Sequence, residues 1–350
     1  MIPRRWQPVV LVALVLLAFS NSFRGEFFYD DYPAIVQNPH LRHWSTAWDA
    51  PDQSPLAGRP VVSLTFAVNH ALSGLRPWSY HVVNVAIHIG CALLVWGIVR
   101  RVKEEIALPV AALWAVHPLV TESVNYVTQR MELLFGLFLL LTLYCFARRW
   151  HIGSVVACAV GMGCKETMVV APVIVALFDW AFCREQDRPR KYYYAGLFAT
   201  WIVLAAWVLT GARTETVGFQ FRELSAWQYL FTQGGVILHY LRLAVWPQPL
   251  VVDYDDWPVA LMVTWQAVLV AGLVAGSVWL FWKRPRLGFL AAWFFVILAP
   301  TSSVLPIVSE VAAERRMYLP LLAVIVPVAW ALCRARSLVS FRGFAPSAEP

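Results

Sequence analysis

The sequence predicts an all-α integral membrane protein, built as a multi-span helical bundle with a long first outer loop. Apolar residues make up 59% of the 350 residues and charged residues only 14%, whereas a soluble domain carries roughly a quarter charged residues. Long apolar runs recur from one end of the chain to the other, and they are too long and continuous for barrel strands. The eighteen Trp and twelve Tyr suit two interfacial belts.

The apolar runs give the expected spans in chain order. They fall at about 8–22, 80–99, 106–116, 133–147, 152–164, 167–183, 192–210, 259–282, 287–300 and 317–333. A further run, 226–246, is interrupted by polar residues, so we expect a half-buried or re-entrant helix there that does not cross. Residues 1–336 then form one membrane domain, followed by a short, disordered cytoplasmic tail at 337–350.

Basic residues predict the orientation, because cytoplasmic loops carry an excess of Lys and Arg. With the N-terminus inside and 226–246 not crossing, 17 of the 28 basic residues fall in cytoplasmic loops, including the cluster KRPR at 283–286. This arrangement predicts ten spans with both ends in the cytoplasm. The long first outer loop, residues 23–79, and most of the acidic residues then lie on the opposite face.

Composition also excludes several function classes. The net charge of +7 comes without a basic cluster interleaved with aromatic residues, so we expect no nucleic-acid partner. None of the six cysteines forms a CxxC motif, which argues against a zinc site and a disulfide framework. No glycine-rich phosphate loop is present, so a soluble nucleotide-sugar site is not expected.

Three apolar runs are shorter than the roughly 20 residues that a crossing needs. They are 106–116, 133–147 and 152–164. Ionisable residues at their outer ends would lie below the membrane surface, where they require a water-filled recess lined by protein. The residues expected around this recess are His117, Glu122, Arg130, Lys165 and Glu166. The alternatives are an amphipathic interfacial helix after Pro118, with Glu122 and Arg130 on one face, and a simple loop salt bridge at Lys165–Glu166.

Two adjacent arginines, Arg315 and Arg316, stand in the motif SEVAAERRMYLP at the mouth of a predicted span. Each guanidinium can donate two parallel hydrogen bonds to a phosphate, and basic residues are disfavoured on the outer face without a reason. We therefore expect Arg315 and Arg316 to bind a phosphate. The alternative is a surface charge cluster with Glu310 and Glu314.

The paired aspartates Asp30 and Asp31 stand in the motif FFYDDYP, just after the first span and above the expected recess. A carboxylate there can deprotonate a hydroxyl or bind a divalent metal. The alternative is a capping or turn role. Asp31 is slightly favoured as the base, because Asp30 can cap the turn that leads to Pro33. No cofactor is required by the sequence, and a divalent metal stays open.

Several segments of the chain together resemble a known family. The resemblance rests on six segments in family order, YDDYPAIVQNP, GRPVVSLTFAVNHALSGLRPWSYHVVNVAIH, AVHPLVTESVNYVTQR, CKETMVVAPVIVALFDW, WPQPLVVDYD and ERRMYLP. Together they are similar to the transmembrane part of the TMTC family, the transmembrane, tetratricopeptide-containing O-mannosyltransferase-like proteins, and to its bacterial relatives. The segments span about 29–320.

The resemblance implies a GT-C-type glycosyltransferase in a membrane, with its active site on the periplasmic or luminal face. The donor would be a polyprenyl-phosphate-linked sugar such as mannose, and the transfer to a hydroxyl would invert the sugar. By the same resemblance, Asp30 or Asp31 would be the base, and Lys165, Arg315 and Arg130 would bind the lipid phosphate. A protein or an envelope glycan is the implied acceptor. Further candidate substrate residues lie within the quoted segments, namely Arg59, His81, Asp253, Glu314 and Tyr318.

Two features leave alternatives open. His81 shares a helix face with Asn84 and His88, which could bind a metal, although packing between helices is favoured.

The family continues with a further span and tetratricopeptide repeats, and no 34-residue repeat occurs before Pro350. A partner protein would then supply the repeats, and a bacterial inner membrane is the expected location. The rival functions are a transporter or flippase of a lipid-linked saccharide and an inactive scaffold derived from the enzyme.

Overall fold

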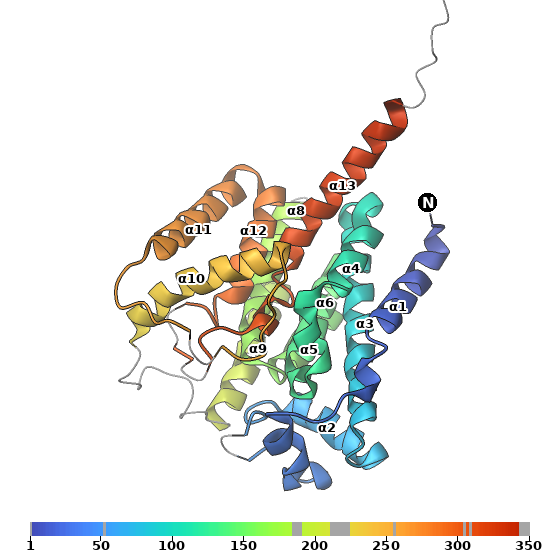
Figure 1. Cartoon of the computed structure of the whole chain (residues 1–350), viewed down its shortest axis with the longest axis vertical. Coiled ribbons are helices and arrows are strands. Elements are labelled where there is room, and N and C mark those ends of the chain that lie inside the picture. The colour runs from blue at the N-terminus through green and yellow to red at the C-terminus, as the bar shows by residue number, and fades with distance from the viewer. Residues whose placement is uncertain are drawn as a thin grey trace, which may run out of the picture.

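The computed structural model describes residues 2–51, 54–183, 191–210, 225–254, 257–303, 306–307 and 310–342. The fold is all-α, as predicted, and the described residues contain no extended strand. Figure 1 shows the helices from α1 to α13. Their bounds are α1 Gln7–Ala18, α2 Pro60–Ser73, α3 Pro77–Val102, α4 Ala107–Ala115, α5 Thr121–Asn125, α6 Arg130–Ala147, α7 His151–Met162, α8 Ala171–Phe182, α9 Lys191–Thr210, α10 Ala226–Val245, α11 Trp265–Lys283, α12 Pro285–Leu298 and α13 Leu322–Arg342.

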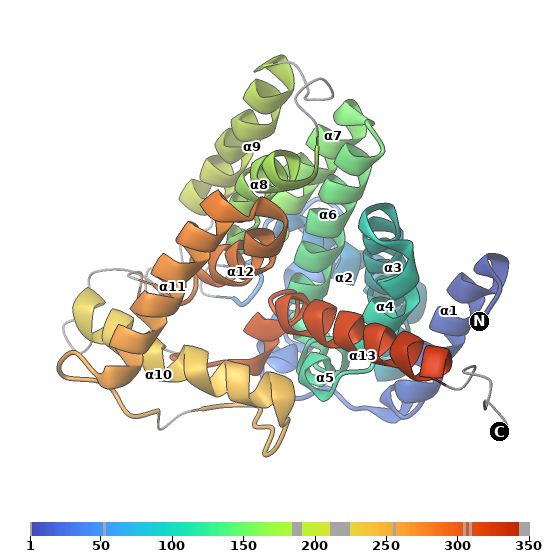
Figure 2. The ribbon, with the colours of Figure 1, turned by 90° about the horizontal axis from the view of Figure 1, so that it is seen from above.

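The helices pack into one bundle around α3 and α6. Helix α3 contacts both α4 and α6, α6 contacts α7, and α7 contacts α9. On the other side, α12 joins α8 to α11, and α13 packs against α4 (Figure 2). One apolar core runs through all of these helices, with Trp114 and Phe135 among its fully buried residues.

Local sequence signals explain where several helices begin. Helices α2, α3 and α12 each start at a proline, whose missing N–H costs nothing at the first helical position. Helix α10 starts with a capping box in which Ser225 and Gln228 exchange side-chain and backbone hydrogen bonds. Helix α2 ends at Gly74, whose φ of +61° lies in a region that favours glycine.

The protein is a multi-span membrane protein. Five helical segments in the described residues are long and apolar enough to cross, and a sixth results if one bent pair counts as a span. The five are Arg4–Arg24, Pro77–Val102, Val127–Ala147, Lys191–Leu209 and Trp265–Lys283. Helices α7, α12 and part of α13 are apolar but shorter. The ten spans expected from the sequence therefore stay a prediction.

Two of the three short runs are short helices in the structure. Helix α4 has only nine residues, and the chain bends by 58° between Glu104–Ala115 and Pro118–Asn125. Helix α7 has twelve residues. The expectation for 133–147 was wrong, because the helical segment there begins at Val127 and has 21 residues. Arg130 is therefore the first residue of α6 and lies near the start of this longer helical segment.

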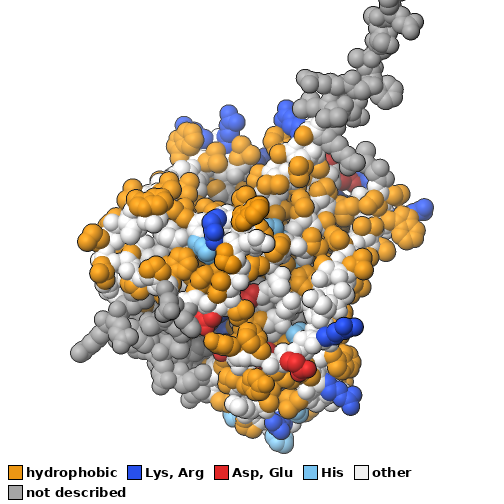
Figure 3. Space-filling model, viewed as in Figure 1, with side chains coloured by type: hydrophobic (Ala, Val, Ile, Leu, Met, Phe, Trp, Pro, Cys, Tyr) orange, Lys and Arg blue, Asp and Glu red, His pale blue; other side chains and the backbone are white. Residues whose placement is uncertain are grey.

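Helix α10 crosses the bundle at a steep angle to α3 and α6 in both views (Figures 1 and 2). It is not among the helices that qualify as spans, in line with the expectation for 226–246. The start of α1 and the end of α13 lie toward the same end of the molecule, where Figure 3 shows several basic side chains. The expected disorder of residues 337–350 was wrong in part, since α13 continues to Arg342.

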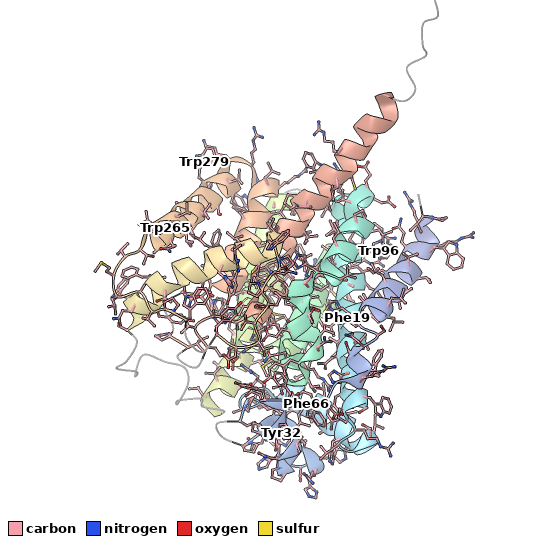
Figure 4. The ribbon with its side chains drawn as sticks, viewed as in Figure 1. Phe19, Tyr32, Phe66, Trp96, Trp265 and Trp279 are labelled. Carbon is pink, nitrogen blue, oxygen red and sulfur yellow. The ribbon has the colours of Figure 1, made fainter. Side chains whose placement is uncertain are left out.

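The first outer loop is folded and has a small core of its own. Ile35, Leu41 and Leu56 of this loop are buried against Phe66 of α2 and Tyr80 of α3. Figure 4 places Tyr32 and Phe66 at the end of the molecule away from Trp96 and Trp279. The loop thus forms a cap on one end of the bundle, and the paired aspartates lie at the start of this cap.

Candidate active site

Asp31 fastens the first outer loop to the start of α6. Its Oδ1 accepts hydrogen bonds from the Thr128 amide at 2.7 Å and from the Thr128 hydroxyl, and its Oδ2 accepts from the Phe28 amide at 3.1 Å. The side chain is only 1% exposed. Burial raises the pKa of Asp31 above its usual value, although these hydrogen bonds act in the opposite direction. Both carboxylate oxygens are therefore occupied inside the protein.

Asp30 occupies a more open position than its neighbour. It is partly exposed, and its backbone amide donates to the Tyr126 hydroxyl at 2.8 Å. Burial and the negative charge of Asp30 together raise the pKa of Tyr126, so the Asp30 carboxylate acts directly on this phenol. The geometry therefore favours Asp30 for contact with a ligand, which reverses the slight preference for Asp31.

A cavity of about 240 Å³ lies beside Tyr126. Its walls come from the first outer loop, α5 with the turn after it, the segment after α10, and the turn before α13. The lining residues are Phe28, Thr121, Glu122, Asn125, Tyr126, Leu250, Val251, Val252 and Glu314. Aromatic, aliphatic, amide and carboxylate side chains thus meet in one hollow, next to Asp30. Figure 3 shows acidic side chains near the middle of this face, among apolar ones.

Arg315 stands directly behind the cavity wall. Its guanidinium forms ion pairs with Glu122 and Glu310, and its backbone amide donates to the second oxygen of Glu122 at 2.8 Å. Burial alone would lower the pKa of Arg315, but the two carboxylates raise it above the usual value. The side chain of Arg315 is 9% exposed. The pair Glu122–Arg315 therefore joins the cavity wall to a buried positive charge.

Two further ion pairs lie close to Arg315. Lys165 pairs with Glu132 of α6, and Arg59 pairs with Glu166 at 2.8 Å. Burial lowers the pKa of Lys165, Glu132 raises it, and Arg59 and Arg315 lower it further, so these charges act on one another. The structure thus brings together three residues of the expected recess, Glu122, Lys165 and Glu166, and adds Arg59 and Arg315 to them, whereas His117 and Arg130 of that expectation lie elsewhere. Each of these basic residues is held by a carboxylate.

Arg316 lies beside this cluster but has different partners. Its guanidinium donates to the backbone carbonyls of Thr301 at 3.3 Å, Val311 at 3.1 Å and Glu310 at 2.5 Å. The side chain is buried. In this arrangement Arg316 holds the turn that carries Glu310, and it does not point a free donor into the cavity.

Arg130 stands apart from the charged cluster. Its guanidinium is fully buried and donates to neutral oxygens, namely Oδ1 of Asn84 at 2.8 Å, Oδ1 of Asn69 at 2.9 Å and the Tyr80 carbonyl at 3.1 Å. It also bonds weakly to Thr65 and lies over the Phe66 ring. The five N–H groups are thus used inside the protein. This geometry gives Arg130 a structural role linking α2, α3 and α6, away from the proposed phosphate.

Glu122 and Arg130 do not share a helix face, contrary to one of the alternatives. Helix α5 ends at Asn125, and Tyr126 is in an extended conformation. A short turn at Val127–Gln129 follows before α6 begins at Arg130. The chain therefore changes direction between the two charges, and only Glu122 reaches the cavity.

The remaining candidates lie at the edges of the site or in the core. His117 caps the turn after α4 and its Nε2 donates to the Ala244 carbonyl at 3.2 Å, which joins α10 to the bundle. Tyr318 is buried against His88 and Trp114, with its hydroxyl 2.8 Å from His88 Nδ1. His81 is buried beside Gly25. None of these three residues lines the cavity.

Two acidic candidates come from the segment after α10 and the turn before α13. Glu314 Oε1 accepts from the Val251 amide at 2.7 Å and from the Tyr254 hydroxyl at 2.7 Å. Asp253 is partly exposed and near this pair in the chain. Asp255 and Asp256, which share its motif, lie outside the described residues. Among the described residues no three His, Cys, Asp or Glu side chains form a metal-binding group.

Sequence reasoning missed two residues of the site. Glu132, the partner of Lys165, stands in the apolar segment QRMELL and is 2% exposed. An isolated acid in an apolar run is a signal, since it requires a partner. Tyr126 is the second of these residues, and nothing in the sequence points to its contact with Asp30.

Comparison with known proteins identifies the relatives of this chain. Residues 53–209 match the family described as dolichyl-phosphate-mannose-protein mannosyltransferase. The chain is 31% identical to human protein O-mannosyl-transferase TMTC4 over 219 residues, which covers 51% of this chain and 30% of the relative. It is 29% identical to mouse protein O-mannosyl-transferase TMTC2 over 248 residues, or 60% of this chain and 29% of the relative.

Further matches agree with these. Protein O-mannosyl-transferase Tmtc2 of Drosophila melanogaster is 31% identical over 194 residues, covering 48% of this chain and 21% of the relative. The chain thus spans less than a third of the length of these curated relatives. No solved structure matches the chain. The described fold and these matches agree with the six segments quoted above, and the chain is similar over about half of its length to the TMTC protein O-mannosyl-transferases.

Proposed function

We propose that the chain transfers a mannosyl group from a polyprenyl-phosphate donor to a hydroxyl acceptor, on the face where the first outer loop lies. The observation that carries this proposal is one cavity whose lining contacts both a half-open carboxylate and a buried cation: the lining residue Tyr126 is bound by Asp30, and the lining residue Glu122 is paired with Arg315. A base and an anion-binding group beside one cavity are what a single displacement at a sugar carbon needs.

The proposed step assigns a role to each charged group beside the cavity. Asp30 removes the proton of the acceptor hydroxyl as its oxygen attacks the anomeric carbon of the sugar. The bond from that carbon to the phosphate oxygen breaks, and the phosphate leaves with the electron pair. Arg315 and Lys165 stabilise the negative charge that develops on the departing phosphate. Attack from the face opposite the phosphate inverts the anomeric centre.

The environments of the two aspartates support this assignment. Asp31 is buried and already accepts three hydrogen bonds, whereas Asp30 is partly exposed beside the cavity residue Tyr126. A general base must reach the proton that it removes, so an occupied, buried carboxylate suits the role poorly. We assign Asp31 to positioning the loop that carries Asp30.

Paired Asn substitutions test the proposal. Transfer of radiolabelled mannose from a polyprenyl-phosphate donor into a membrane extract would be measured for the full chain. Asp30→Asn should keep folding and donor binding and lower turnover by about 10²–10⁴-fold, as expected for a lost general base. Asp31→Asn should lower the melting temperature and reduce turnover less. Glu26→Gln, an exposed acid of the same loop, serves as the control.

Asp30→Asn with wild-type turnover would rule out the proposed base. A labelled donor that crosses the bilayer unchanged would favour the flippase. A protein acceptor is proposed from the relatives alone, because protein O-mannosyl-transferases are what the chain resembles. The periplasmic face of a bacterial inner membrane and a repeat-containing partner remain parts of the same proposal.

A further inference from the structure

We propose that Glu310 is a displaceable counter-ion of the phosphate site, which occupies Arg315 in the absence of donor and leaves it when a lipid phosphate binds. The inference rests on the proposed function, because it concerns the same phosphate site. It adds a residue that competes with the donor and that assists release of the lipid phosphate after transfer.

The first observation is exposure. Three carboxylates bind Arg315 and Lys165, namely Glu122, Glu132 and Glu310. The Glu122 and Glu132 side chains are 7% and 3% exposed, whereas the Glu310 side chain is 37% exposed. Moving a charge out of a buried pair is unfavourable unless water can receive it. Glu310 is therefore the one of these three that can leave its cation and become solvated.

The second observation is how Glu310 is attached. Its backbone carbonyl is bound by Arg316, which also binds the Val311 carbonyl, while its side chain is bound by Arg315. The two arginines thus hold the backbone and the carboxylate separately. A rotation of the Glu310 side chain would free Nη2 of Arg315, while Glu122 stays on Nη1, without moving the turn that positions them.

The third observation is charge balance. Among the described residues the cluster contains four cations, Arg59, Lys165, Arg315 and Arg316, and four anions, Glu122, Glu132, Glu166 and Glu310, so the formal charges of these eight residues cancel. A bound phosphodiester would make the cluster negative by one. Release of one carboxylate into water restores the balance, and buried clusters resist uncompensated charge.

Glu310 is also an anion under ordinary conditions. Burial alone would raise its pKa, but Arg315, Arg316 and Lys165 outweigh burial and lower the pKa below its usual value. The carboxylate thus faces the same cations that the proposed function assigns to the phosphate. Because it carries a negative charge of similar size, it occupies the position of the ligand and competes with it.

This competition has a consequence for turnover. After the sugar leaves, the remaining polyprenyl phosphate carries more negative charge than the donor and would bind Arg315 more tightly. Glu310 can return to Arg315 and so favour release of this product. Removing the Glu310 charge should therefore tighten binding of lipid phosphate, lower KM and lower kcat together.

Binding of farnesyl phosphate, a short polyprenyl phosphate, to the purified full chain tests the inference. Glu310→Gln should bind about tenfold more tightly than the wild type, since one charge-assisted hydrogen bond no longer competes. Glu310→Ala should behave alike and guards against a folding defect of a single variant. Glu26→Gln removes an exposed acid from the same face and should leave affinity unchanged. Uncharged farnesol should bind all variants equally.

The outcomes separate the two proposals. If the wild type binds farnesyl phosphate and both Glu310 variants bind it equally or more weakly, the counter-ion role is wrong and the phosphate site stands. If neither the wild type nor the variants bind it, the phosphate site itself is wrong and the inference fails with it. Tighter binding of farnesol by Glu310→Gln would indicate a change of packing and would also overturn the counter-ion role.

Discussion

Arg130 and Arg315 differ in what surrounds their guanidinium groups. Both are buried, at 0% and 7% exposure. Arg130 is bound by amide, hydroxyl and carbonyl oxygens of α2 and α3, whereas Arg315 is bound by two carboxylates. A charge solvated by neutral dipoles has no anion to exchange, while a charge held by carboxylates can trade one anion for another. Burial alone therefore does not reveal which arginine serves a ligand.

The strongest test of this contrast is Arg130→Met. The substitution leaves the side-chain oxygens of Asn69 and Asn84 buried without their donor, and each such group costs about 1–3 kcal/mol. We expect a loss of at least about 2 kcal/mol of stability, measured by chemical unfolding in detergent. The stability of Arg130→Lys should lie between that of the wild type and that of Arg130→Met, because lysine keeps the charge and lacks the planar donors. Wild-type stability of Arg130→Met would remove the structural role.

The second test compares Arg315→Gln with the double variant Arg315→Gln, Glu122→Gln. The single variant strands a buried carboxylate, which typically costs about 3–5 kcal/mol. The double variant removes that charge as well and should recover most of the stability. Farnesyl phosphate binding should stay at least about tenfold weaker in both. Equal stability of the single and double variants would show that Glu122 and Arg315 are not a coupled pair.

The pH dependence of melting gives a third, smaller effect of opposite sign for Asp31 and Glu310. The pKa of Asp31 is raised, so its contribution to the free energy of unfolding is full below about pH 3.8 and is lost as the pH rises through the raised pKa. The pKa of Glu310 is lowered, so its contribution is present above about 4.5 and is lost as pH falls through the lowered value. Between about pH 3.8 and 4.5, the difference in melting temperature from the wild type should therefore change with pH in opposite directions for Asp31→Asn and Glu310→Gln. A change in the same direction for both variants would contradict this.

Single cysteines perturb the protein least and compare how accessible two positions are to a thiol reagent in water. Glu166, beside the charged cluster, has a side chain that is 43% exposed, whereas Arg130 is fully buried. In a background that lacks Cys164, Glu166→Cys should react with a membrane-impermeant thiol reagent added from the outer side. Arg130→Cys should stay unlabelled. Labelling of Glu166→Cys from the cytoplasmic side alone would invert the proposed orientation of the site.

The sequence predicted the helical membrane class and much of the charged cluster, for clear physical reasons. Apolar runs must be helical inside a membrane, and buried charges need partners, so Lys165 and Arg315 could be singled out from their neighbours in the chain. The outcome for Arg130 could not be predicted in the same way. Its partners Asn69 and Asn84 lie more than a helix away in sequence, and only the fold brings them to its guanidinium.

The two aspartates show the same limit at shorter range. Adjacent residues point in different directions, so one of Asp30 and Asp31 had to face inward, but the motif alone does not say which. The choice depends on the backbone around Tyr29, which has a φ of +53°, and on the distant Thr128, whose amide and hydroxyl bind Asp31. Local sequence reasoning had no access to either.

The bond between Glu122 and Arg315 joins residues that are 193 positions apart. At a synthesis rate of about 5–20 residues per second, Arg315 emerges from the ribosome roughly 10–40 s after Glu122. During that interval the carboxylate has entered or approached the bilayer without its cation. The newly made chain must therefore hold Glu122 in water or in its protonated form until Arg315 has been made, and the cavity wall is completed only after that point.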